Sequence, residues 1–231
     1  MSGKININNT TIHREGDDYT IESINIYSTD PKEINPTNAQ QKHLSIGSDF
    51  VAGSIIGDFT YQTLGESLKW HLYHHLPSLC NHKHTHHLGN NNCNLSFDIY
   101  DVEPLKEFLL LPIDIEKAIT IKAFLNDNNQ KIWLKTEVPQ LTFSEQELRG
   151  MEITLESTPN KSIVKGGGTL ENQDGIKVTA NMTANADNDQ LTLGASWNSS
   201  PNKLFDGQFQ TKLQFAYTDD NQLSVFIDSD S

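Results

Sequence analysis

The second half of the chain alternates apolar and polar residues with a period of two, and this pattern restricts the fold more than any other feature. Ile119, Ile121, Ala123 and Leu125 would share one face of a strand, whereas Thr120 would point to the other face. Such alternation is typical of a β-strand with one buried and one solvated face. The same pattern recurs in residues 132–138, 151–155, 176–182, 191–197, 209–217 and 223–227.

Short polar segments separate these strands, at residues 126–129, 172–175, 187–189 and 219–221. They are rich in Asn, Asp and Gly, which tolerate the backbone of tight turns, so consecutive strands should be antiparallel neighbours. None of the segments has the spacing of a calcium-binding loop. Gly166 to Gly168 lacks the Lys-Ser/Thr and the helix of a phosphate-binding loop, and we interpret it as a bulge or a strand entry.

The first half of the chain is expected to contain strands at 5–7, 19–27 and 51–61, and two short amphipathic helices. The first helix would span about Leu64 to Leu76 and end at Pro77, and the second would run from Val102 to Pro112. We predict three segments: N-terminal strands (1–62), a helical insert with a His-rich polar loop (63–112) and an antiparallel β meander (113–231).

A sheet with one apolar face must cover that face or fill it with a ligand. We expect a mainly β fold, an antiparallel meander curled into an elongated, β-taco-like groove with two short amphipathic helices. The alternative is a closed β-sandwich, in which the same side chains would fill a core.

Charge and composition exclude several functions. Asp and Glu outnumber Lys and Arg by 30 to 17, which argues against a nucleic-acid-binding surface and leads us to expect no nucleic acid as partner. No stretch approaches the roughly 20 apolar residues of a membrane span, and no secretory signal precedes the first strand. The chain has no G-x-S-x-G, H-E-x-x-H or P-loop motif, so we do not expect an enzyme.

Cysteines and histidines gather in the middle of the chain. Seven of the nine histidines fall between residues 71 and 87, and Cys80 and Cys93 flank the densest part. Imidazole and thiolate can bind zinc or copper, but the run from His82 to His87 has no paired C-x-x-C and is followed by three asparagines. We predict a polar loop with no metal site and no cofactor. A Cys80–Cys93 disulfide and two free thiols both fit the sequence.

Two stretches, 48–79 and 94–125, resemble the translocation and assembly module proteins of Gram-negative bacteria, the TamB branch of the AsmA superfamily. In this chain, as in that family, a strand pair leads to a helix that ends with Leu-Pro-Ser-Leu. A polar gap follows, and then a strand that precedes a short helix with the sequence Glu-Pro-Leu. The match is carried by Gly57, Phe59, Tyr61, Leu64, Leu76, Pro77, Leu79, Phe97, Glu103, Pro104 and Leu105. The His-rich stretch falls in the variable gap of that family.

The resemblance implies an interior fragment of a larger periplasmic protein that is anchored to the inner membrane and meets an outer-membrane barrel partner. It also implies a hydrophobic groove that shields acyl chains for phospholipid transport between the two membranes or assists outer-membrane assembly. A β-sandwich binding module without lipid transport is the alternative function. From the alternation we expect the groove to be lined by Ile121, Leu134, Ile153, Val178, Leu193, Leu213 and Val225.

Overall fold

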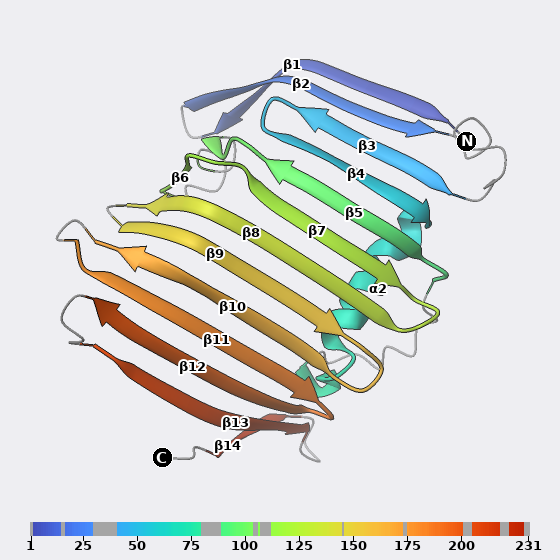
Figure 1. Ribbon diagram of the computed structural model, residues 1–231. Helices are drawn as coiled ribbons and strands as arrows, with labels where there is room; N and C mark the ends of the chain where they lie inside the picture. The colour runs from blue at the N-terminus through green and yellow to red at the C-terminus, as the bar shows by residue number, and fades with distance from the viewer. Residues whose placement is uncertain are drawn as a thin grey trace.

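The strands of the computed structural model form one antiparallel sheet (Figure 1). The structure describes residues 2–14, 17–29, 41–79, 89–103, 106, 112–144, 146–172, 175–200, 205–217 and 222–228. In these residues the sheet has 14 strands. Thirteen of them follow the order β1-β2-β3-β4-β5-β7-β8-β9-β10-β11-β12-β13-β14, and the remaining strand, β6, pairs with β8 beside this path. Neighbours in the chain are therefore neighbours in the sheet, as the short polar turns predict.

The strands differ in length, and β6 is the shortest of those that the structure describes. Their bounds are β1 (Gly3–Arg14), β2 (Asp17–Thr29), β3 (Lys42–Ser48), β4 (Val51–Asp58), β5 (Asn92–Ile99), β6 (Ile113–Ile115), β7 (Ile119–Asn126), β8 (Lys131–Phe143), β9 (Gln146–Ser157), β10 (Ser162–Glu171), β11 (Lys177–Asp187), β12 (Gln190–Ser200), β13 (Gly207–Tyr217) and β14 (Leu223–Asp228). Helix α2 spans Tyr61–Tyr73, and the short 3₁₀ helix η1 spans Pro77–Leu79.

The expectation of a mainly β, antiparallel meander is confirmed, but the sheet is neither closed nor strongly curled (Figure 1). The strands do not divide into two facing layers, so the alternative of a closed β-sandwich does not describe these residues. The predicted helical insert (63–112) also contains a strand, β5 (Asn92–Ile99). This strand pairs with β4 on one side and with β7 on the other.

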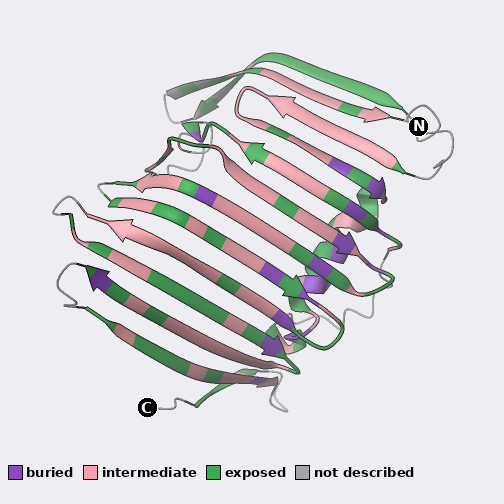
Figure 2. Cartoon of the chain, in the orientation of Figure 1, coloured by how far each residue is buried: buried purple, intermediate pink, exposed green. Residues whose placement is uncertain are grey.

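Helix α2 packs on one face of the sheet, across one end of the strands, and the buried residues gather beside it (Figure 2). Leu64 of α2 packs against a cluster that contains Ile55, Cys93, Leu125 and Ile132 from four successive strands of the path. A second cluster, formed by Leu76, Ala186 and Phe215, lies farther along the sheet. The core therefore lies at one end of the strands, under helix α2, and does not extend over the whole apolar face.

The predicted turns have the backbone that their residues favour. Asn188 and Asp189, between β11 and β12, have φ angles of 49° and 59°, which Asn and Asp tolerate better than other non-glycine residues. The Asn129 N–H donates to Asn126 Oδ1 (2.9 Å) in the turn between β7 and β8. At the glycine run, the register of β10 against β9 shifts between Gly167 and Thr169, as expected of a bulge.

The helices differ in part from the expectation. Helix α2 begins at Tyr61, before the predicted Leu64, and ends at Tyr73, before the predicted Leu76; η1 follows from Pro77. Most of the second predicted helix lies outside the described residues, and so does the stretch from Cys80 to Leu88. Among the described residues, no helix is long and apolar enough to cross a membrane.

Candidate functional site: an apolar row beside helix α2

The register of the sheet places one set of side chains in a continuous line, which we call the apolar row. Each member is the cross-strand partner of the next, so all project from the face on which α2 packs. From β1 to β13 the apolar row consists of Ile5, Ile26, Ile46, Gly53, Phe97, Ile121, Thr136, Ile153, Gly166, Met182, Ala195 and Phe209.

Large side chains cover the glycines of the apolar row. A Cβ on Gly53 would lie 2.0 Å from Cδ1 of Phe97, so the ring occupies the space above the glycine. Met182 lies over Gly166 in the same way, with its Cγ 3.3 Å from the position of a Cβ. The glycines thus let their larger neighbours lie across the strands, which smooths the face instead of leaving separate knobs.

A second line of residues lies between the apolar row and α2, and it is mostly aliphatic. Leu95, Ala123, Leu134 and Leu155 are successive partners in it, and Leu193 continues it on β12. Leu95 and Leu134 are partly buried and pack against the core cluster under α2. The core therefore passes without interruption into the apolar row, and burial decreases with distance from α2.

The seven residues that we expected to line a groove all lie on this face. Ile121 and Ile153 belong to the apolar row, and Leu134 and Leu193 to the line beside it. By register Val178, Leu213 and Val225 share the same face. Six of the seven are half-buried, and Val225 on β14 is 47% exposed.

The sequence did not single out the most exposed members of the apolar row. Ile5, Met182 and Phe209 keep 55%, 52% and 50% of their surface accessible. Phe97 covers Gly53. Alternation assigned these residues to an apolar face, but it contains no information on register. Register decides which residues of different strands come together, and only the paired sheet supplies it.

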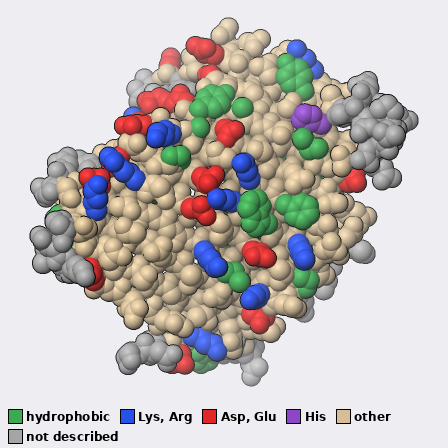
Figure 3. All heavy atoms as spheres, in the orientation of Figure 1, with side chains coloured by type: hydrophobic (Ala, Val, Ile, Leu, Met, Phe, Trp, Pro, Cys, Tyr) green, Lys and Arg blue, Asp and Glu red, His purple; other side chains and the backbone are tan. Residues whose placement is uncertain are grey.

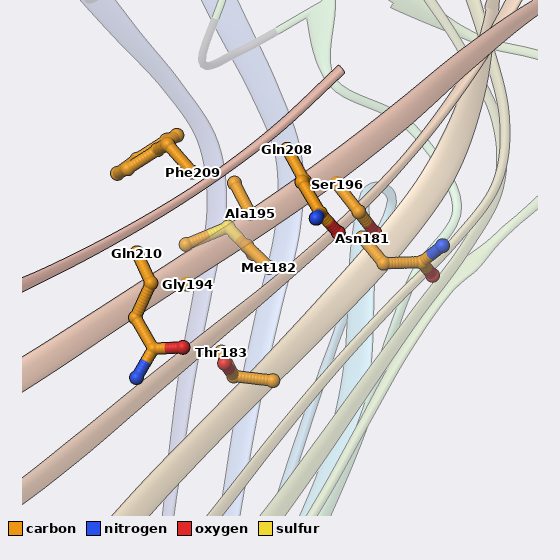
Figure 4. A pocket seen from close by; sticks show the side chains of 9 residues that line it. All are labelled: Asn181, Met182, Thr183, Gly194, Ala195, Ser196, Gln208, Phe209 and Gln210. Atoms are coloured by element: carbon orange, nitrogen blue, oxygen red, sulfur yellow. The ribbon is translucent and has the colours of Figure 1, made fainter. Parts of the chain in front are cut away.

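A shallow hollow of about 500 Å³ opens where the apolar row crosses β11, β12 and β13. Figure 4 shows Met182 and Phe209 pointing to one side of the strands, while Asn181, Ser196 and Gln208 point to the other. The complete lining is Asn181, Met182, Thr183, Gly194, Ala195, Ser196, Gln208, Phe209 and Gln210. None of these side chains titrates near neutral pH, so the hollow offers contact surface and amide or hydroxyl groups but no acid–base chemistry.

The opposite face of the sheet has a different character (Figure 3). Charged side chains of both signs are scattered over it, together with separate groups of hydrophobic ones. Lys135 forms ion pairs with Glu137 (3.0 Å) and Glu152 (2.9 Å), two carboxylates that neighbour it on this face. The same strands therefore present charges to one side and the apolar row to the other.

A buried polar network fixes the first half of α2 to the end of the sheet. Asn91, which is 1% exposed, accepts a hydrogen bond from the Thr60 N–H (3.0 Å) at the start of the helix. Its amide nitrogen donates to Ser67 Oγ and to Asp127 Oδ2, both at 2.8 Å. Ser67 Oγ also donates to Asp127 Oδ2 (2.8 Å). Asn91 thereby joins the helix, the strand β5 that follows it and the β7–β8 turn.

The residues that follow α2 are attached at two further turns. His75 Nε2 donates to the carbonyl of Thr158 (2.8 Å) in the β9–β10 turn. In the β11–β12 turn, the Asp189 N–H donates to the carbonyl of His75 (2.9 Å), and Asp189 Oδ1 accepts from the Ser78 N–H (2.8 Å). The anchoring residues 127, 158 and 189 are equally spaced in the sequence, because each hairpin brings the chain back to the same end of the sheet.

One pair in this region is buried without full hydrogen bonding. His71 Nε2 lies 3.5 Å from Asp127 Oδ1, and both side chains are 0% exposed. In the part of the chain that the structure describes, neither the ring nitrogens nor Oδ1 have a hydrogen-bond partner. Burial lowers the pKa of His71, and the nearby Asp127 carboxylate only partly opposes this. Burial, with a smaller contribution from Asp127, raises the pKa of the Cys93 thiol to about 11.

The two questions about metal and disulfide bonds receive partial answers. Cys93 is a buried free thiol, and Cys80 lies outside the described residues. Within the described ranges, His, Cys, Asp and Glu side chains do not form a group of three or more that could hold a metal ion. His82, His84, His86 and His87 lie outside those ranges, so the prediction of a polar loop there is unchanged.

Comparison with known proteins gives no relative for this chain: no family profile, curated protein or solved structure matches it.

Proposed function

We propose that this chain is a segment of a TamB/AsmA-like protein of the periplasm, and that its apolar face shields phospholipid acyl chains in a hydrophobic groove on their way between the inner and outer membranes. Assistance to outer-membrane assembly would use the same face. The observation that supports the proposal is the apolar row, which crosses twelve strands and stays partly exposed for most of its length.

The chemistry of the row suits acyl chains. Its side chains are aliphatic or aromatic apart from Thr136 and two covered glycines, and none is charged. Each methylene that leaves water gains about 0.8 kcal/mol, so even partial contact with such a face compensates for much of the cost of carrying a lipid tail through water. No covalent step is needed.

The length of the row favours a path over a single binding pocket. Strands in a sheet lie about 4.8 Å apart, so twelve strands give a row of about 50 Å. One leaflet of a bilayer contributes about 15 Å of hydrocarbon, half of the roughly 30 Å core. The row is therefore about three times as long as an acyl chain, which allows a lipid tail to move from strand to strand without leaving an apolar surface.

The proposal can be tested with Met182→Asp, which places a charge in the row at a side chain that is already half-exposed and should leave the fold intact. Asn185→Asp is the matched control, since it adds the same charge to an exposed residue of the same strand, on the opposite face and outside the hollow. Each purified variant would be incubated with a photoreactive phosphatidylethanolamine that carries its label at the end of an acyl chain. Crosslinked lipid would be quantified by mass spectrometry.

We expect Met182→Asp to reduce crosslinking at β11–β13 at least fivefold and Asn185→Asp to leave it within a factor of two. Circular dichroism would verify that both variants are folded. Equal crosslinking in the three proteins, or crosslinks located on the charged face, would contradict the proposal.

A further inference from the structure

We infer that α2 is a pH-sensitive strap, held on the sheet while His71 is neutral and released when His71 takes up a proton. The inference concerns the attachment of α2 and does not depend on the proposed lipid function. It begins with an anomaly of geometry, a fully buried imidazole that has no hydrogen bond and faces a buried carboxylate oxygen that also has none.

The surroundings of His71 favour its neutral form. The titratable groups that act on it are Asp127 in the β7–β8 turn and the imidazoles of His74 and His75 next to it in the chain. Asp127 attracts a proton to the site, but its other oxygen, Oδ2, already accepts bonds from Ser67 and Asn91. The two imidazoles and the dry environment oppose a positive charge, and burial is the largest of these effects.

The sign of the pH dependence follows from this arrangement. With α2 in place the pKa of His71 lies below its ordinary value of 6.5, whereas with α2 released it returns to that value. The released form therefore binds the proton more tightly, and acidification below pH 6.5 shifts the equilibrium toward it. The opening constant rises by up to about tenfold per pH unit until the lower pKa is reached.

Release of α2 would expose the hydrophobic cluster that it covers at one end of the strands. Cys93, which is 1% exposed, belongs to the cluster against which Leu64 of α2 packs, so its accessibility reports on the helix. The anchors at Thr158 and Asp189 hold the residues that follow α2, and both use groups whose bonding does not require His71. The strap would thus open first at the end near Asp127.

The test measures the reaction of Cys93 with dithiodipyridine in the full chain carrying Cys80→Ser, from pH 8 to pH 5. Each rate is divided by the rate of the urea-unfolded chain at the same pH, which cancels the change in thiolate fraction. We expect this ratio to rise by up to about fivefold between pH 6.5 and pH 5.5, because the released imidazole is already half protonated at pH 6.5. The rise should vanish in His71→Gln and persist in His43→Gln, a matched change on β3. A ratio that is independent of pH, or an equal rise in His71→Gln, would overturn the inference.

A second measurement decides the matter if His71→Gln does not fold. Hydrogen exchange of the Cys80→Ser chain should show α2 amides losing protection below pH 6.5 while amides of β12 and β13 keep theirs. In the same pH range the NMR signals of the His71 ring should change to those of the charged form. Loss of protection in all elements together, or a His71 ring that stays neutral while α2 opens, would refute a local strap controlled by this residue.

Discussion

Replacing Asn91 with Ala should destabilise the protein more than any other change of an asparagine in the described residues, because this side chain links three elements. The variant loses the bond from Asn91 to the Asp127 carboxylate, a charged and buried acceptor, at a cost of about 1.5–3 kcal/mol. It also leaves the Thr60 N–H without its partner at the partly buried start of α2, which adds about 1 kcal/mol. We expect a decrease of about 3 kcal/mol in the free energy of unfolding.

The assay is urea unfolding followed by circular dichroism, with Asn126→Ala as the control. Asn126 also makes two side-chain hydrogen bonds, to Asn92 (3.3 Å) and from Asn129 (2.9 Å), but both are exposed to solvent. Its replacement should cost less than about 1 kcal/mol, because water replaces the lost partners. If Asn91→Ala costs no more than Asn126→Ala, the buried network does not hold α2 and the reasoning is wrong.

Two further predictions concern the face under α2 and the apolar row. At pH 8, Cys93 in the Cys80→Ser chain should resist alkylation by iodoacetamide and react only after unfolding in urea, because it is buried and its thiol has a pKa of about 11; rapid labelling of the native protein would contradict this. Gly53→Ala should lower stability by about 1–3 kcal/mol, since its Cβ would collide with the Phe97 ring, whereas Gly47→Ala meets no atom within 4 Å and should change stability little; equal effects in thermal unfolding would rule out the proposed packing.

The sequence was sufficient for most of the strands and for their antiparallel order, because both depend on local patterns. Alternation identified the strands after residue 118, and Asn- and Asp-rich turns indicated that neighbours in the chain pair with each other. The alternation did not reveal β3 (Lys42–Ser48), because Leu44 and Ile46 are its only large apolar residues and two residues make a weak pattern. The sequence also could not predict that the sheet is not strongly curled, because curvature depends on twist and bulges summed over all strands.

The buried network at α2 illustrates a different limit. Asn91 stands in a run of asparagines that is typical of a solvated loop, and His71 belongs to a histidine-rich region that drew attention to metal binding instead. Both are buried because α2 crosses the sheet at the end where the turns lie, and this brings Asp127 against them. A contact between residues so far apart in sequence leaves no periodic signal, so the sequence alone could not identify these residues as anchors.

Stability alone does not account for the apolar row. Helix α2 covers only one end of the strands, so residues such as Ile153 and Met182 gain little from it, and polar side chains would serve there as well as they do on the opposite face. The neighbours of Ile153 in the chain, Glu152 and Thr154, show that the same strand carries polar residues where it meets water. Soluble domains rarely expose a contiguous apolar patch larger than a few hundred Å² unless it binds something. A surface that must accept acyl chains and let them slide would need this combination of a charged face, an apolar face and a helix that leaves most of the latter uncovered.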